Sequence, residues 1–105
     1  MLTALAAEGP TLDAVPAERF GRAPYFVLVE GGNLVEAIPN QEAQGSSGVG
    51  GRVVMQLAQK GVRRVVAPQF GPKAQTALDA AGIEALPLTG GPTLKELAAS
   101  LETRG

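Results

Sequence analysis

The chain of 105 residues carries a formal net charge of −1, with 45% hydrophobic and 18% charged residues, so one folded domain over residues 1–105 is expected and a disordered chain is not. A charge this close to zero argues against a dedicated nucleic-acid-binding protein, because such proteins gather Lys and Arg on one face. There is no apolar run that could cross a bilayer and no basic, secretory-type N-terminus, so the expectation is a cytoplasmic protein without membrane or nucleic-acid partners.

The first part of the chain predicts strands joined by one long loop and one tight turn. Residues 2–7 are a short apolar segment typical of a strand, and residues 8–24, rich in glycine and proline, predict a long ordered loop. YFVLVE at 25–30 and LVEAIP at 34–39 flank Gly31-Gly32-Asn33, which is a hairpin pattern.

The rest of the chain predicts helices that alternate with strands. Apolar residues at helical spacing predict helices over 52–60, 74–81 and 94–101, and Thr93 with Glu96 forms a capping box for the last of them. Glycine follows each of the first two helices, which is a common way for a helix to end.

Two further strands complete a mixed sheet. RRVVAP at 63–68 and IEALPL at 83–88 predict strands, and Pro87 indicates that the second of these lies at an edge or ends there. The helix after each strand forces parallel neighbours through right-handed crossovers, whereas the hairpin makes the second strand antiparallel. The expected fold is therefore α/β, a five-stranded mixed sheet with about three helices packed on it.

This strand order predicts that four loops meet at one edge of the sheet: residues 8–24, 40–51, 68–73 and 89–93. Ligands of open α/β sheets bind beyond the carboxyl ends of the strands. Three helices are expected to begin at this edge, and their free backbone N–H groups would suit an anion.

The stretch GSSGVGG at 45–51 offers a bare backbone to such a ligand. Ser46 and Ser47 can donate hydrogen bonds or cap the helix, and Gly48 and Gly50 lack side chains that would keep a bulky ligand away. The alternative is a flexible loop with a serine cap. Neither the P-loop pattern nor the dinucleotide-binding pattern is present, so the known phosphate motifs are excluded.

Basic residues stand near the same loops. Arg19 and Arg22 flank Phe20 and can converge on one anion, and the alternative is that they serve solubility while Phe20 anchors the loop. Arg52 and Lys73 are expected in first helical turns, where a cation opposes the helix dipole unless an anion lies nearby. The alternative is that both point to water.

The composition argues against catalysis. The chain has no His and no Cys, which excludes imidazole bases, thiolate nucleophiles and Cys or His metal ligands. Glu30 and Glu36 flank the hairpin turn, away from the glycine-rich loops, and no pair of carboxylates stands where it could hold Mg²⁺ or act as acid and base. We therefore expect a protein that is not an enzyme.

The chain resembles the dinitrogenase iron–molybdenum cofactor biosynthesis family over most of its length. The segments that carry the resemblance are AERFGRAPYF at 17–26, SSGVG at 46–50, KGVRRVVA at 60–67, GPKA at 71–74, AAGI at 80–83 and the residues from Gly90 onward. Lys73 departs from the Asn that is usual in the family. The glycine-rich loop also lacks the His or Cys that a carrier ligating a cluster directly would use.

The resemblance implies a ribonuclease H-like motif fold and non-catalytic binding of an anionic metal–sulfur cofactor or precursor, of the iron–molybdenum type, in cluster assembly or trafficking. Cluster-assembly proteins are the implied protein partners. Neither Cys nor His of this chain would ligate the metal. The residues expected to bind the ligand are Arg19, Phe20, Arg22, Ser46, Ser47, Gly48, Gly50, Gln69, Gly71, Pro72, Lys73 and Gly90.

Two other functions remain open from the sequence. A binding module for a small phosphate-bearing metabolite would use the same loops and differ only in the size and metal content of its ligand. A hydrolase is the least favoured function, because the chain lacks a carboxylate cluster.

Overall fold

The sheet of this protein has its first strand near the centre. The computed structural model describes residues 1–40, 49–87 and 93–104, and within these ranges it contains five strands and three α-helices. The strands are β1 (Thr3–Ala7), β2 (Tyr25–Glu30), β3 (Asn33–Pro39), β4 (Arg64–Val66) and β5 (Glu84–Leu86), in the spatial order β3-β2-β1-β4-β5. β2 is antiparallel to β1 and β3, whereas β4 and β5 run parallel to β1. The α/β fold with a mixed sheet is confirmed.

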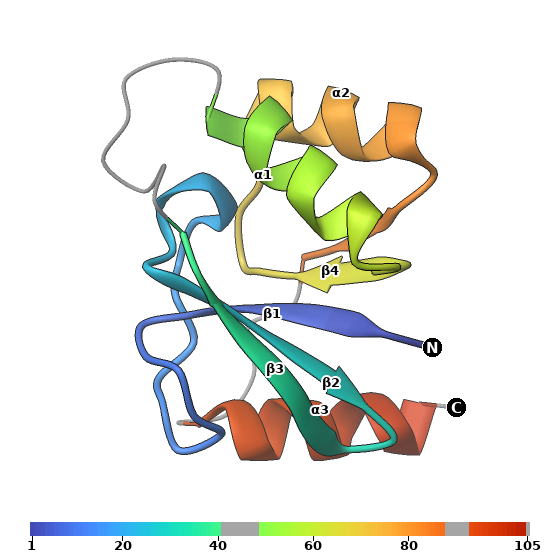
Figure 1. Ribbon diagram of the computed structural model, residues 1–105. Helices are drawn as coiled ribbons and strands as arrows, with labels where there is room; N and C mark the ends of the chain where they lie inside the picture. The colour runs from blue at the N-terminus through green and yellow to red at the C-terminus, as the bar shows by residue number, and fades with distance from the viewer. Residues whose placement is uncertain (41–48, 88–92, 105) are drawn as a thin grey trace.

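The helices cover both faces of this sheet. α1 (Val49–Gln59) and α2 (Pro72–Ala81) lie together on one face, and α3 (Leu94–Arg104) lies on the other (Figure 1). A short 3₁₀ helix, η1 (Phe20–Arg22), interrupts the long loop between β1 and β2. In the described residues, no helix is long and apolar enough to cross a membrane.

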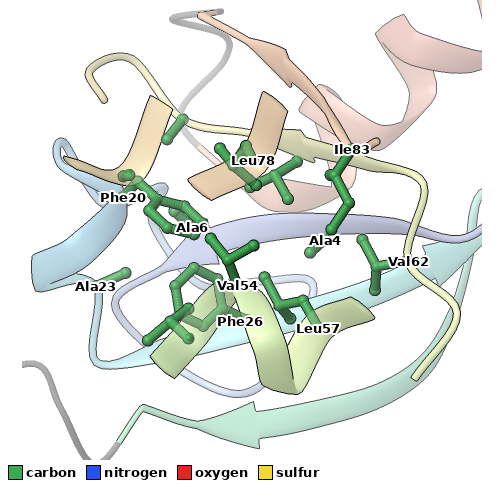
Figure 2. Close-up of a cluster of buried hydrophobic side chains, with 14 of the residues drawn as sticks. Ala4, Ala6, Phe20, Ala23, Phe26, Val54, Leu57, Val62, Leu78 and Ile83 are labelled. Atoms are coloured by element: carbon green, nitrogen blue, oxygen red, sulfur yellow. The ribbon is translucent and has the colours of Figure 1, made fainter. Parts of the chain in front are cut away.

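A separate apolar core fills each side of the sheet. Alternate residues of β2 point to opposite sides, so Phe26 and Leu28 join the core under α1 and α2, while Val27 and Val29 join the core under α3. Figure 2 shows the first of these cores, in which Phe20 lies beside Phe26. All five residues of β1 are buried, as is typical of a strand covered on both faces.

The hairpin between β2 and β3 closes on two residues. Gly31 and Gly32 have φ values of 61° and 80°, which a type I′ turn requires, and Glu30 pairs directly with Asn33. The hairpin pattern in the sequence predicted Asn33 in the turn, but in the structure Asn33 is the first residue of β3. Farther along β3 the register shifts, and Val35 is an extra residue that forms a β-bulge on this edge strand.

The sequence placed most element boundaries to within a few residues. α1 begins at Val49 and not at residue 52, and α3 continues to Arg104. The strands β4 and β5 are shorter than expected, with three residues each, because proline follows shortly after both: Pro68 and Pro87 cannot donate a ladder hydrogen bond. β5 is an edge strand that ends at Leu86, as Pro87 indicated.

We expect Gly82→Ala to lower the free energy of unfolding by about 1 kcal/mol. Gly82 ends α2 in the left-handed region, with φ of 73°, and donates its N–H to the carbonyl oxygens of Leu78 and Asp79. Gly71→Ala is the matched control, because Gly71 has an ordinary φ of −71° and a Cβ there would meet open space. Urea unfolding of both variants measures the difference. Equal stability of the two would contradict this account of the helix end.

Candidate functional site

The carboxyl ends of β1, β3, β4 and β5 share one edge of the sheet, as predicted, and the segment 8–24 runs along this edge. It contacts the loop after β4 through a short parallel bridge between Arg19 and Gln69. Gln69 donates its backbone N–H to the carbonyl of Glu18 at 3.0 Å, and Phe20 donates to the carbonyl of Gln69 at 3.0 Å. The structure therefore brings Arg19 and Gln69, both exposed, next to each other.

The same segment is bonded to the residue that follows β3. Asn40 is 7% exposed and donates its side-chain amide to the carbonyl of Ala23 at 2.8 Å and to that of Gly21 at 3.4 Å. Its backbone N–H donates to the carbonyl of Pro24 at 2.8 Å. Segment 8–24 thus connects the ends of three strands, and the predicted meeting of the loops is confirmed for their described parts.

The N-terminus of α3 is not free for a ligand. Leu94 and Lys95 donate their N–H groups to the carbonyls of Ala14 and Leu12, at 2.9 and 2.8 Å. The N–H of Glu96 donates to Oγ1 of Thr93 at 3.4 Å, which is the expected N-cap bond. The expectation that three helix N-termini share one anion is therefore wrong for α3, whose first donors are used within the chain.

The N-terminus of α2 is more open. Its N-cap residue, Gly71, makes no side-chain capping bond, and Pro72 occupies the first turn. Gly71, Pro72 and Lys73 are all exposed, and no atom of the described residues beyond the chain neighbours lies within 4 Å of the position that a Cβ of Gly71 would take. The described residues therefore leave the backbone at Gly71 uncovered.

The first turn of α1 includes part of the glycine-rich stretch. Because α1 starts at Val49, Gly50 is a helical residue and not a loop residue, and Arg52 lies in the first turn with an exposed side chain. Ser46, Ser47, Gly48 and Gly90 lie outside the described residues, so their predicted contacts with a ligand stay predictions.

Phe20 is placed differently from its neighbours. Its side chain is fully buried, with ring centroids 5.1 Å from Phe26 and 5.5 Å from Phe70. A buried ring cannot touch a ligand at the surface, so Phe20 serves the site by fixing the turn that carries Arg19 and Arg22. No sequence pattern singled out Phe70, whose part in this cluster depends on the contact with Phe20.

Four exposed cations belong to elements at this edge. Arg19 caps η1, Arg22 ends η1, and Arg52 and Lys73 lie in the first turns of α1 and α2. Lys73 and Pro72 also line an open hollow of about 400 Å³ along α2, together with Thr76, Ala77 and Ala80. Lys73 is the only charged residue among the described residues of that hollow.

Glu8, Asp13 and Glu18 are exposed on segment 8–24, whereas Glu30 and Glu36 are in ion pairs at other places. Oε2 of Glu30 lies 3.4 Å from the N-terminal amine, and Oε2 of Glu36 lies 2.8 Å from Nζ of Lys60 at the end of α1. Among the described residues, the structure contains no group of three or more His, Cys, Asp or Glu side chains that could hold a metal ion. The donors at this edge are guanidinium, ammonium and backbone N–H groups, which suit an anion.

The family assignment follows from a comparison over nearly the whole chain. The model of the family described as dinitrogenase iron-molybdenum cofactor matches residues 1–104. The chain belongs to this family. The resemblance seen in the separate sequence segments is thereby confirmed.

Solved structures agree with this assignment. The apo form of the orange protein from Desulfovibrio gigas is 34% identical, with a TM-score of 0.87, over 98% of this chain and 88% of that one. A NifB-like protein from Thermotoga, of the DUF35 family, is 33% identical, with a TM-score of 0.81, over 99% of this chain and 88% of that one. The comparison with curated proteins gave no match.

Proposed function

We propose that this family member binds an anionic metal–sulfur cofactor or precursor of the iron–molybdenum type, as a carrier in cluster assembly or trafficking. The observation that carries the proposal is that exposed cations lie on elements at this edge of the sheet, with Arg19 held by backbone bonds beside Gln69, shortly before α2. The family description supports the proposal. The orange protein supports it too, because its structure is described as an apo form, which is the form of a protein without its bound group.

The donor set fits a cluster that brings its own sulfides. Thiolate and imidazole are absent from the chain, so binding rests on charge and hydrogen bonds to the outside of the cluster. Arginine is suited to this because its planar guanidinium presents several N–H donors in a fixed geometry. Exposed cations on separate elements also allow a ligand larger than a single phosphate to be held.

Binding without catalysis is part of the proposal. Acid–base and nucleophilic catalysis need a proton acceptor near the reacting group. Glu18 is the carboxylate nearest in sequence to the two arginines, and it is exposed, whereas Glu30 and Glu36 are in the ion pairs described above. A carrier needs a site that binds and releases its cargo unchanged.

An anaerobic titration tests the proposed ligand class. Isolated iron–molybdenum cofactor is added to the purified protein, with molybdate and ATP as comparison ligands, and bound metal is measured after gel filtration. We expect stoichiometric retention of molybdenum, iron and sulfide together, and an affinity that falls as salt rises because ions screen an exposed charged site. Tight binding of ATP without retention of the cofactor would instead favour the phosphate-bearing metabolite.

A further inference from the structure

Asn40 is the most deeply buried polar side chain at this edge among the described residues. It follows β3 directly, and its amide spans the backbone of the η1 turn through the carbonyls of Gly21 and Ala23. Those carbonyls lie on either side of Arg22, the last residue of η1. The side chain therefore holds the backbone on both sides of one of the exposed arginines.

This contact matters because an arginine side chain is long and its position depends on its backbone. The turn is bonded at its other end through Phe20 and Gln69 and packs on the aromatic ring of Phe26. Asn40 adds the bonds to the half of the turn that Phe20 does not fix. A fixed backbone lowers the entropy lost when the guanidinium is ordered on a ligand.

We propose that Asn40 is a positioning residue of this site, which holds the Gly21–Ala23 turn so that Arg22 is presented to the anionic ligand. The inference rests on the proposed function. Asn40 is absent from the binding residues expected from the sequence. Its role depends on contacts with Ala23 and Gly21, which lie 17 and 19 positions earlier in the chain.

The variant that tests this is Asn40→Asp. A carboxylate has the shape of the amide but cannot donate to the two carbonyls, and it repels them. At pH 8 we expect affinity for isolated iron–molybdenum cofactor to fall about tenfold relative to wild type. Burial beside two carbonyl oxygens disfavours the charged carboxylate and raises the pKa of the introduced acid, so at pH 5 the protonated form donates one hydrogen bond again and the ratio to wild type should recover to within about threefold. Measuring the ratio at each pH cancels changes in the cofactor itself.

Asn33→Asp is the matched control. It adds the same charge at the other end of β3, where the exposed Asn33 side chain makes one long bond of 3.5 Å to the carbonyl of Gly31. We expect it to change affinity less than twofold at either pH. A loss as large as that of Asn40→Asp would show that net charge alone is responsible, and it would overturn the positioning role.

A double variant separates positioning from general destabilisation. If Asn40 acts through Arg22, Asn40→Asp should cost less than threefold in a background that already carries Arg22→Ala. A full tenfold loss in that background would overturn the inference. Amide exchange without ligand gives a second readout: the N–H groups of Ala23, bonded to Phe20, and of residue 40 should exchange faster in Asn40→Asp, while that of Val62, bonded to Leu57, should not.

The outcomes distinguish the two proposals. If Asn40→Asp leaves the exchange of those two amides unchanged, the role of Asn40 is overturned and the proposed function stands. The same holds if Asn40→Asp loosens the turn but leaves the affinity for the cofactor unchanged. Failure of the wild-type protein to bind isolated cofactor overturns the proposed function, and the positioning role for that ligand falls with it.

Discussion

Replacing Phe20 by Ala is expected to lower the free energy of unfolding by about 3–5 kcal/mol, which is a large part of the total stability of a small domain. Phe20 is fully buried and packs between Phe26 of β2 and Phe70 of the loop after β4. Removing the ring leaves a cavity where η1, β2 and the loop after β4 meet. Urea unfolding monitored by circular dichroism measures the change.

Val15→Ala is the control for this prediction, because Val15 belongs to the same long segment but is 57% exposed. It should change stability by less than about 0.5 kcal/mol. A loss below about 1 kcal/mol for Phe20→Ala would mean that the ring does not anchor the segment, and the account of how the arginines are placed would have to be abandoned.

Replacing Arg19 or Arg22 by Ala is expected to weaken binding of isolated iron–molybdenum cofactor about tenfold or more. A hydrogen bond to a charged group contributes about 1.5–3 kcal/mol, and 1.4 kcal/mol corresponds to one decade in affinity. Both side chains are exposed, so their loss should leave the fold intact. The measurement is the anaerobic titration at low and moderate salt.

Arg63→Ala gives the matched control for charge. Arg63 is exposed and directly precedes β4, so it lies at the sheet edge opposite the candidate site, and its loss changes the net charge equally. We expect less than a twofold effect on binding. Equal affinity of wild type and both site variants, or binding that ignores salt, would refute an electrostatic site.

The architecture could be predicted from the sequence because it depends on local patterns. Apolar spacing, the glycines after α1 and α2, and the two glycines of the hairpin fix the elements, and short connections then restrict their directions. The predicted ends of the elements were less accurate. α1 begins with Val49, Gly50 and Gly51 although glycine disfavours a helix, because intrinsic helix propensity is a weak effect that tertiary context overrides.

The candidate site could be predicted only in outline. The meeting of the loops follows from strand direction, but the state of each helix N-terminus does not. Whether α3 offers its N–H groups depends on the carbonyls of Leu12 and Ala14, which are distant in sequence. The sequence offered two roles for Phe20, as a ligand contact or as an anchor of the loop, and its burial in a three-residue turn favours the anchor.

The bonds from Leu12 and Ala14 to α3 have a consequence for the order of folding. They join the early part of the chain to its last helix, so closing this contact carries the entropy cost of a long loop. The hairpin of β2 and β3 needs only neighbouring residues and can form early. Residues 12–14 of the long segment therefore gain these bonds only when α3 docks, after the hairpin can already have formed.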